Sequence, residues 1–478
     1  MREEPSTQTQ PQPQAAQPQP QAQMPSRAST YALFAIVVLG AALGNLSQTA
    51  VNAILSDIMP EFGMSVDVGQ WLTTIYMLML GITVPAVAFI TKRLSVRQHV
   101  LAALGVFIAG ALVDVVAPNF AILLVGRILQ AVAAGMLLPL MQTIAMTRFP
   151  AGKQATAMGI AGIALGFAPN VGPTVGSAMS TAWGWRSLFV LLMILALALA
   201  IAAAASIRPS APLDTSAQLD VCSLILSTLG FGGLLLGFSN ASSYAITSPF
   251  IWAPIVIGVV FIVLFVLRQN RIEHPLVSMK IFKSSQYVRG FIAQNLLNAS
   301  YMGITLVLPL YIEDLCGGTT VQAGIALLPG TVAALIVNPL AGVLTDRFGA
   351  RPVVVVASAF LATGATLMSF VDAETPFYLV MIFQGLRAIG VSGLISPLAS
   401  WSLAKLPPDQ VVDGSSFCVV VRQACASFGT SLMVFAITAV GATAAGLANP
   451  ALAYQVAFGI SAALAIATFV YCVAKVKE

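Results

Sequence analysis

Charged residues are scarce in this sequence. Only 8% of its 478 residues are Asp, Glu, Lys or Arg, whereas 58% are hydrophobic. Soluble proteins contain about 25% charged residues, so this composition excludes a soluble protein and indicates an integral membrane protein. After the first 28 residues, no polar stretch is long enough to fold into a domain with its own core.

Residues that bind metals or form disulfides are also scarce. The five cysteines show no CxxC spacing, and the two histidines, His99 and His274, stand at the edges of apolar segments. This pattern excludes a zinc enzyme and indicates that the cysteines are small packing residues. The sequence contains no Walker loop, nucleophile triad or pair of catalytic carboxylates, which excludes ATP hydrolysis. We therefore expect no enzyme activity, metal or cofactor.

The chain begins with a polar tail and continues as a series of hydrophobic segments. Residues 1–28 are mostly Gln, Pro, Ala and Ser, which predicts a disordered tail and not a signal peptide. Fourteen apolar segments follow, each long enough to predict a transmembrane helix. They lie near 30–55, 68–91, 99–117, 119–147, 155–181, 186–207, 220–239, 249–268, 287–312, 319–345, 352–371, 376–402, 414–444 and 450–474.

Two parts of the chain echo one another. Spans two and ten are each followed by a basic turn of the same length, and GMLLP in span four (135–139) matches GLISP in span twelve (393–397). Repeated halves are typical of secondary transporters. We therefore predict an all-α membrane fold of two six-helix halves with two inserted helices. Its parts are a cytoplasmic tail at 1–28, the first half at 29–207, the insertion with a linker at 208–286, and the second half at 287–478.

The polar segment after span eight, 268–290, is amphipathic, and we expect it to lie on the membrane surface. Basic residues indicate the orientation of the helices. If the N-terminus is cytoplasmic, Arg186 alone among the 22 Lys and Arg lies outside, and Arg127, Arg387 and Arg422 lie within spans. The positive-inside rule therefore predicts a multi-pass protein of the plasma or inner membrane with both termini in the cytoplasm.

Span five carries the most distinctive pattern. Small residues and prolines recur every three or four positions and form one stripe along the helix. The stripe consists of Gly159, Gly162, Gly166, Pro169, Pro173 and Gly176. It permits the close approach of another helix, and the prolines permit bending. Two interpretations remain open, a static helix pair or a moving contact between the halves of a transporter.

Polar side chains inside spans are costly in lipid, so they mark candidate sites. Two stripes of uncharged polar residues either line a central cavity or link helices. They are Asn45, Gln48 and Asn52 in span one, and Gln294, Asn298, Tyr301 and Thr305 in span nine.

Arg127 in span four is a charge at depth, either a structural clamp onto backbone carbonyls or a group that steers proton exchange. Arg387 and Arg422 are long enough to snorkel toward the cytoplasm. Asp114 is the sole carboxylate within a predicted span, ~22 Å along span three at 1.5 Å per residue. It either reaches interfacial water or carries a proton.

Six stretches carry a family resemblance. They are the span-five run with Pro169, Gly172, Pro173 and Gly176; VGRILQAVAAG with Arg127 and Gln130; QWLTTIYML with Trp71 and Tyr76; NLSQTAVNAIL; SSFCVVVRQACASFG; and GVLTDRFGARP with Asp346, Arg347, Gly349 and Arg351. Together they resemble the major facilitator superfamily, and within it the fourteen-span drug:proton antiporters of the lincomycin-resistance type.

The resemblance implies an exporter of amphipathic, cationic or neutral drug-like compounds that works by alternating access. The proton gradient is its energy source, and no cofactor is needed. Its partners are membrane lipid, the small-molecule substrate and protons, with no nucleic acid, and a monomer is expected. We expect coupling and gating from Arg127, Asp114, Asp346, Arg347, Arg351 and Arg422, and a cavity lined by Asn45, Gln48, Asn52, Trp71, Tyr76, Gln294, Asn298 and Tyr301.

Two positions depart from the family pattern. Ser47 stands where many members carry Asp in span one, and Lys92 and Ser95 replace an Asp and a Gly in the first gating loop. Proton coupling is therefore implied by the resemblance and not by these residues. An exporter of one endogenous metabolite, peptide or lipid precursor remains an alternative, as does a non-transporting membrane sensor.

Overall fold

The computed structural model describes residues 27–208, 220–241, 244, 247–273 and 275–477. The expected disordered tail lies outside these residues, except for its last two positions, which begin the first helix. Within the described residues the protein is entirely helical. The α-helices are α1 Arg27–Ala53, α2 Leu55–Phe62, α3 Val66–Gly69, α4 Trp71–Arg93, α5 Val96–Val116, α6 Phe120–Arg148, α7 Gln154–Trp183, α8 Arg186–Ser206, α9 Val221–Asn240, α10 Pro249–Gln269, α11 Ser285–Tyr301, α12 Ile304–Leu310, α13 Thr320–Phe348, α14 Ala350–Met368, α15 Phe377–Leu403, α16 Pro408–Gly441, α17 Ala444–Ala448 and α18 Ala451–Lys475.

The all-α membrane fold predicted from the sequence is confirmed. Twelve helices in the described chain are long and apolar enough to cross a membrane, and α7 makes a thirteenth if its two bent parts form one span. Each of the fourteen predicted segments coincides with a helix, the shortest apolar stretch being Trp71–Val87 of α4. Fourteen spans are therefore compatible with the structure.

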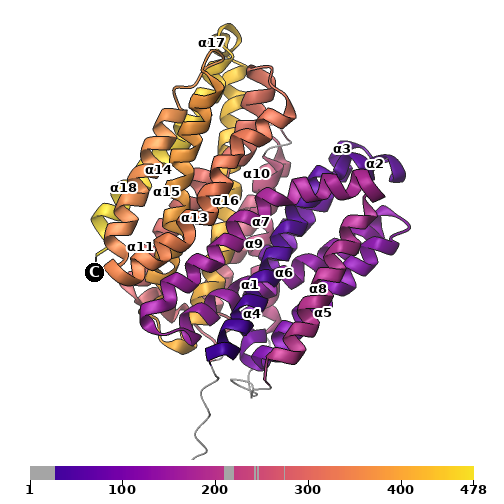
Figure 1. Cartoon of the computed structure of the whole chain (residues 1–478), viewed down its shortest axis with the longest axis vertical. Coiled ribbons are helices and arrows are strands. Elements are labelled where there is room, and N and C mark those ends of the chain that lie inside the picture. Colours follow the sequence, from indigo (N-terminus) through magenta and orange to yellow (C-terminus); the bar gives the residue numbers. More distant parts are fainter. Residues whose placement is uncertain (1–26, 209–219, 242–243, 245–246, 274, 478) are drawn as a thin grey trace, which may run out of the picture.

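The two sets of six long helices pack in the same way. In the first set, α6 packs against α4 and α5, and α5 packs against α8. In the second set, α15 packs against α13 and α14, and α14 packs against α18. These pairs involve equivalent spans of the repeat, so each set forms one bundle around its own apolar core (Figure 1).

The inserted pair is attached to both bundles. Helix α9 packs against α10, against α4 of the first bundle and against α16 of the second. Helix α10 turns a row of exposed apolar side chains outward, including Val256, Val260 and Val263. Apolar surface of this kind is suited to lipid, which places α10 at the periphery.

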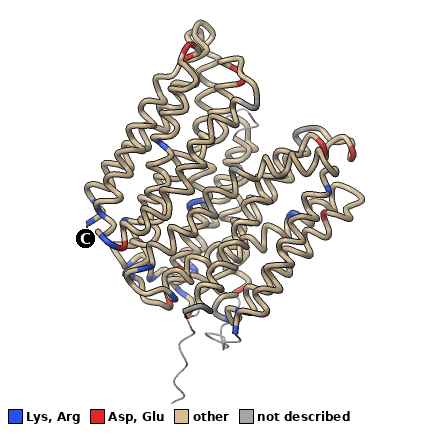
Figure 2. Tube along the Cα trace, in the orientation of Figure 1, with Lys and Arg blue, Asp and Glu red and all other residues tan. Residues whose placement is uncertain are grey.

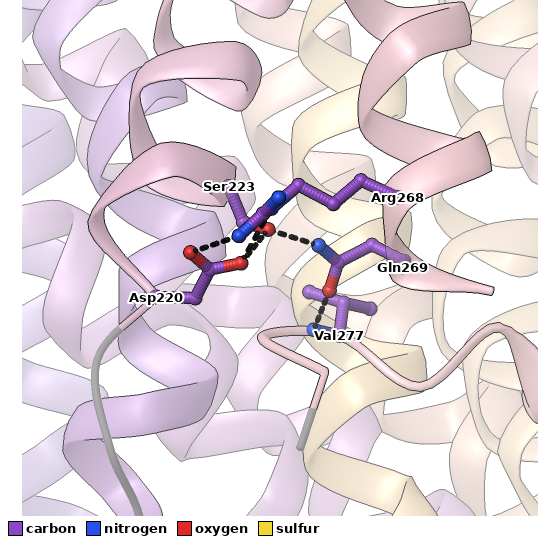
Figure 3. A network of polar contacts seen from close by, with 5 residues as sticks. All are labelled: Asp220, Ser223, Arg268, Gln269 and Val277. Carbon is purple, nitrogen blue, oxygen red and sulfur yellow. Dashed lines mark hydrogen bonds and ion pairs between the residues drawn. The ribbon is translucent and has the colours of Figure 1, made fainter. Parts of the chain in front are cut away.

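A polar network joins α9, α10 and the loop that follows them (Figure 3). Asp220, directly before α9, accepts two hydrogen bonds from the Arg268 guanidinium at 2.8 and 2.9 Å, and Ser223 also donates to it. Gln269 donates to the Ser223 hydroxyl and accepts a hydrogen bond from the Val277 backbone N–H. The hydrogen bonds from Arg268 lower the pKa of Asp220 to about 2.

The amphipathic segment after α10 buries its apolar side chains inside the protein, whereas the sequence pattern predicted that they face the membrane surface. Leu276, Val277 and Ile281 are buried in the core, and the Ser278 N–H donates to Asp413 at the start of α16. Burial inside the protein removes the same apolar surface from water as burial in lipid, which explains why the sequence pattern alone could not distinguish them.

The bundles meet at one end and diverge at the other (Figure 1). The end where they meet carries most of the basic positions, shown blue in Figure 2, and we call it the basic end. The opposite end carries α2, α3 and α17, with acidic positions. There Glu61 pairs with Arg186 at 2.6 Å and accepts a hydrogen bond from Trp185, which lowers the pKa of Glu61.

Candidate functional site

A buried polar cluster surrounds Arg127 inside the first bundle, seven residues from the start of α6 and so nearer the end opposite the basic end. Its guanidinium donates to the Ser47 hydroxyl at 2.7 Å and to Gln130 Oε1 at 2.8 Å, and its Nε donates to the Leu72 carbonyl. Ser47 also donates to Gln130 Oε1. The guanidinium carbon lies 4.3 Å from the centre of the Tyr76 ring, a cation–π contact. Three helices, α1, α4 and α6, thus converge on one permanent charge and fix its position.

Asp114 lies beside this cluster on α5. Its side chain is fully buried, and neither carboxylate oxygen has a hydrogen-bond partner among the described residues. Arg127 is the charged group that interacts with it electrostatically, although the two form no direct ion pair. One guanidinium nitrogen of Arg127, Nη2, also lacks a partner. A buried carboxylate and a buried guanidinium therefore each retain unused hydrogen-bonding capacity.

A close approach of α5 and α6 puts Asp114 at this position. The Asp114 carboxylate packs directly over Gly126, where any side chain would collide with it. At Gly110, one turn earlier on α5, an added methyl group would come within 2.8 Å of the Gly126 carbonyl oxygen. The two glycines therefore let the helices touch, and Asp114 is enclosed and does not reach interfacial water.

The stripe on α7 faces two different partners. At the basic half of the helix, a methyl group on Gly159 would lie 2.6 Å from the Asn338 carbonyl of α13, and Gly162 contacts the Asn338 side chain. Toward the other end, a methyl group on Gly176 would lie 2.6 Å from the Ala50 carbonyl of α1. One helix therefore packs tightly against both bundles, against α13 of the second bundle and against α1 of the first.

The remaining stripe residues follow the same division. Gly166 faces Ala334 of α13, and Gly172 faces Thr49 of α1. Pro169 lies between these contacts, where α7 bends by 42°, and Pro173 follows one turn later. Proline removes a backbone hydrogen bond and is a recognised cause of such bends. The bend separates the part of α7 that contacts the second bundle from the part that contacts the first.

Asn338 was not singled out from the sequence. Its side chain is fully buried and donates to the Gly162 carbonyl across the two bundles at 3.1 Å and to the Ala334 carbonyl at 3.0 Å. The sequence feature that indicates Asn338 is an amide side chain directly before Pro339 in an apolar span. Thr143 and Ser415, whose hydroxyls lie 3.2 Å apart, form another link between the bundles.

The second gating loop joins the bundles at the basic end. The Asp346 carboxylate, near the end of α13, accepts hydrogen bonds from the backbone N–H groups of Ala155 and Thr156 at 3.1 and 2.7 Å. These N–H groups belong to the first turn of α7, where a helix favours negative charge. Arg347 and Arg351 are exposed nearby.

The first gating loop does not make the corresponding contact. The Ser95 hydroxyl accepts from the Gln98 N–H, and the Gln98 side chain accepts from the Ser95 N–H, a capping box at the start of its own helix α5. Nothing is described of the Lys92 side chain. The two copies of the gating loop are thus structurally different: one caps a helix of the other bundle, and the other caps its own.

The predicted cavity residues occupy mixed environments. In span one and its neighbour, Asn45 and Gln48 are partly buried, Asn52 is exposed and accepts a hydrogen bond from Thr73, and Trp71 is exposed. Tyr76 is fully buried and donates to the Gly44 carbonyl, so it belongs to the Arg127 cluster.

In span nine, Gln294 and Asn298 are buried. Gln294 donates to Ser402 of α15 at 3.0 Å, and Asn298 donates to the Gln294 carbonyl at 2.7 Å. Tyr301 is partly exposed and is the last residue of α11. Met302 and Gly303, which separate α11 from α12, keep helical backbone dihedrals, and Ser285–Leu315 forms one span, as predicted. Thr305, on α12, is exposed and donates to the Met302 carbonyl.

The two other arginines within spans differ in their surroundings. Arg387 is 3% exposed and donates from Nε to Gln384 on the same helix at 2.9 Å, which does not fit the predicted snorkelling. Helix α16 begins at Pro408, so Arg422 lies fourteen residues from the basic end and is partly exposed. Snorkelling of Arg422 stays a prediction.

Comparisons with known proteins agree with this architecture. The family model described as Major Facilitator Superfamily matches residues 37–430 and, in a second match, residues 290–478. The chain is 35% identical over 409 residues to the MFS-type transporter YhcA of Bacillus subtilis, covering 84% of this chain and 75% of that protein. It is 30% identical over 407 residues to the lincomycin resistance protein LmrB of Listeria monocytogenes, covering 85% and 86%.

A solved structure supports the fold. The human organic anion transporter MFSD10 superimposes with a TM-score of 0.65 over 93% of this chain and 99% of that one, at 14% identity. Identity at this level carries information on fold alone. The family match, the relatives and the shared fold agree, and this chain belongs to the major facilitator superfamily.

Proposed function

We propose that this protein is a proton-coupled exporter, which moves amphipathic compounds out of the cell in exchange for protons by alternating access. The proton gradient supplies the energy, so no cofactor is required, and one chain suffices. The basic end then faces the cytoplasm of a plasma or inner membrane, with both termini inside, in accordance with the positive-inside rule. Relatives such as LmrB, named for lincomycin resistance, support export of drug-like compounds.

The observation that carries this proposal is the environment of Asp114. A carboxylate without hydrogen bonds is costly to ionise inside a membrane protein, whereas a guanidinium next to it lowers that cost. Arg127 is close enough to interact electrostatically but is engaged by Ser47 and Gln130. A modest shift of Arg127 between these partners and Asp114 changes whether Asp114 holds a proton.

The position of the contacts between the bundles supports a specific state in the cycle. The described hydrogen bonds that join the bundles, at Asp346, Asn338, Thr143 and Ser415, all lie in the basic half. The bundles diverge at the opposite end (Figure 1). We propose that this arrangement is the outward-facing state, in which the enclosed Asp114 already holds its proton.

The rest of the cycle follows from the same contacts. When the bundles rock, the Asp346 contact and the α7–α13 contact at Gly159 open, and the basic ends separate. Arg127 then turns its free nitrogen toward Asp114, which favours the ionised carboxylate and releases the proton to the cytoplasm. Asp114 must be protonated in the outward-facing state and ionised in the state with separated basic ends. Proton entry is therefore coupled to the conformational change between these two states.

The experiment uses purified protein in liposomes with an imposed pH gradient and an internal pH dye. Rhodamine 6G, ethidium and lincomycin are added one at a time. For the compounds that are transported, the wild type is expected to produce compound-dependent proton movement. Asp114→Asn, which keeps the size of the side chain but not its charge, should abolish this movement. Glu374→Gln, on an exposed outer loop, is the matched control and should retain it.

Retention of compound-dependent proton movement by Asp114→Asn would overturn the role of Asp114. Transport of a compound without any proton movement in the wild type would overturn proton coupling. Both results are independent of protein yield, because each compares proton movement with and without the compound in the same liposomes.

A further inference from the structure

The interior of the second bundle contains uncompensated positive charge. Arg387 on α15 lies sixteen residues from the basic end of its helix, and Arg422 on α16 lies fourteen residues from its own. Tyr301 lies sixteen residues from the start of α11. At 1.5 Å per residue these three positions have the same depth, ~21–24 Å from the basic end.

Tyr301 interacts electrostatically with both Arg422 and Arg387. They come from three different helices, and α11 packs against both α15 and α16.

No carboxylate balances these arginines in the described part of the chain. The ion pairs there are Arg186 with Glu61 and Arg268 with Asp220, both outside this region. Helix α15 has no acidic residue, and the acids of α16, Asp409 and Asp413, lie near its basic end. In the first bundle, by contrast, Arg127 has Asp114 beside it.

Arg387 also has unused hydrogen-bonding capacity. The side chain is only 3% exposed, and its Nη1 is buried without a hydrogen-bond partner among the described residues. A buried, always charged guanidinium is costly, and it is retained in membrane proteins where it binds something or pairs with another charge. Tyr301 and Arg422 are partly exposed, so a ligand that reaches them also enters the field of Arg387.

We infer that Tyr301, Arg387 and Arg422 form an anion subsite, which binds the carboxylate of an amphipathic organic acid during export. The planar guanidinium fork matches the two oxygens of a carboxylate, and the Tyr301 hydroxyl supplies a further donor. This inference rests on the proposed export function and narrows its substrates. It departs from the cationic or neutral compounds implied by the family resemblance.

The test measures equilibrium binding, without any gradient, in nanodiscs of zwitterionic phosphatidylcholine. Three probes share one fluorophore and differ in charge: dansylglycine is anionic, its primary amide is neutral and dansylcadaverine is cationic. The wild type should bind dansylglycine at least about tenfold more tightly than the amide, or ~1.4 kcal/mol. Arg387→Gln and Arg422→Gln should each reduce this preference to about threefold or less.

Arg97→Gln is the matched control, since Arg97 lies near the basic end and its guanidinium donates to the Ala204 carbonyl. It should keep the full preference for the anion. The binding assay requires neither a gradient nor proton movement, so loss of the anion preference marks failure of the subsite, whereas loss of compound-dependent proton movement in liposomes marks failure of proton-coupled export.

Equal or tighter binding of the amide or the amine by the wild type would overturn the anion subsite, as would undetectable binding of dansylglycine. A preference that persists in both arginine variants would overturn the assignment of these residues. The comparison of the three probes on the wild type requires no variant, so it remains decisive if a variant is unstable.

Discussion

The Arg127 guanidinium donates a hydrogen bond of 2.7 Å to the Ser47 hydroxyl. Ser47 stands where the family resemblance leads one to expect an Asp, so in this protein the arginine has a neutral partner in α1. The carboxylate has not been lost from the bundle. It is supplied from α5 by Asp114, which interacts with Arg127 electrostatically but makes no hydrogen bond. In this protein the acid beside Arg127 therefore belongs to α5 and not to α1.

A carboxylate in α1 should therefore substitute for Asp114. In Asp114→Asn, adding Ser47→Asp places an acid within hydrogen-bonding distance of Arg127. We expect the double variant to recover at least about tenfold more compound-dependent proton movement than Asp114→Asn alone, or ~1.4 kcal/mol in the barrier. Liposome assays of the two variants and of Ser47→Asp alone measure this. If the double variant is as inactive as Asp114→Asn, a carboxylate near Arg127 is insufficient for coupling.

Closing of the basic end should depend on Gly159. An alanine there would place a methyl group 2.6 Å from the Asn338 carbonyl, so α7 and α13 must separate. We expect Gly159→Ala to populate states with separated basic ends. Spin labels at positions 153 and 405, in a cysteine-free background, report this as a longer distance by double electron–electron resonance. Gly105→Ala on α5, where an added methyl group meets nothing within 4 Å, should leave the distance distribution unchanged.

Asp346 should stabilise the same closed contact through charge. Its carboxylate caps the first turn of α7, an interaction worth about 0.5–2 kcal/mol at a helix start. Asp346→Ala should therefore shift the spin-label distances toward separation by several-fold in population, whereas Ser95→Ala should not, because Ser95 caps its own helix. Equal effects of the two variants would mean that the gating loops act alike despite their different contacts.

The polar network at the start of α9 predicts a dependence of stability on pH. Hydrogen bonds from Arg268 lower the pKa of Asp220 to about 2, below the usual value near 3.8. The stabilising contribution of the ionised carboxylate is thus present above pH ~4 and is lost as the pH falls toward 2. Asp220→Asn should melt at a lower temperature than the wild type at pH 6. At pH 2 the two melting temperatures should converge, and a difference that persists there would exclude this ion pair as the cause.

The sequence was sufficient to predict the helical segments, the repeat and the importance of span five, because apolar length and helical spacing determine them directly. It could not predict that the stripe on α7 serves two partners. The choice of partners depends on where α7 bends. Pro169 and Pro173 allow a bend but do not determine which helices pack against α7 before and after it.

The site was predicted residue by residue but not as an arrangement. Polarity in an apolar span indicated Arg127, Asp114 and Tyr301 as candidates. Their surroundings depend on packing between distant segments. Gly126 determines how deeply Asp114 is enclosed, and the common depth of Tyr301, Arg387 and Arg422 arises from three separate helices.

The most direct test of proton coupling through Asp114 is infrared spectroscopy of the purified protein in nanodiscs at neutral pH. A protonated carboxylic acid has a C=O stretching band that an ionised carboxylate lacks. In the outward-facing state we expect such a band in the wild type, and its absence in Asp114→Asn. An identical band region in the two proteins would contradict the account, because Asp114 would then hold no proton in the state that should carry one.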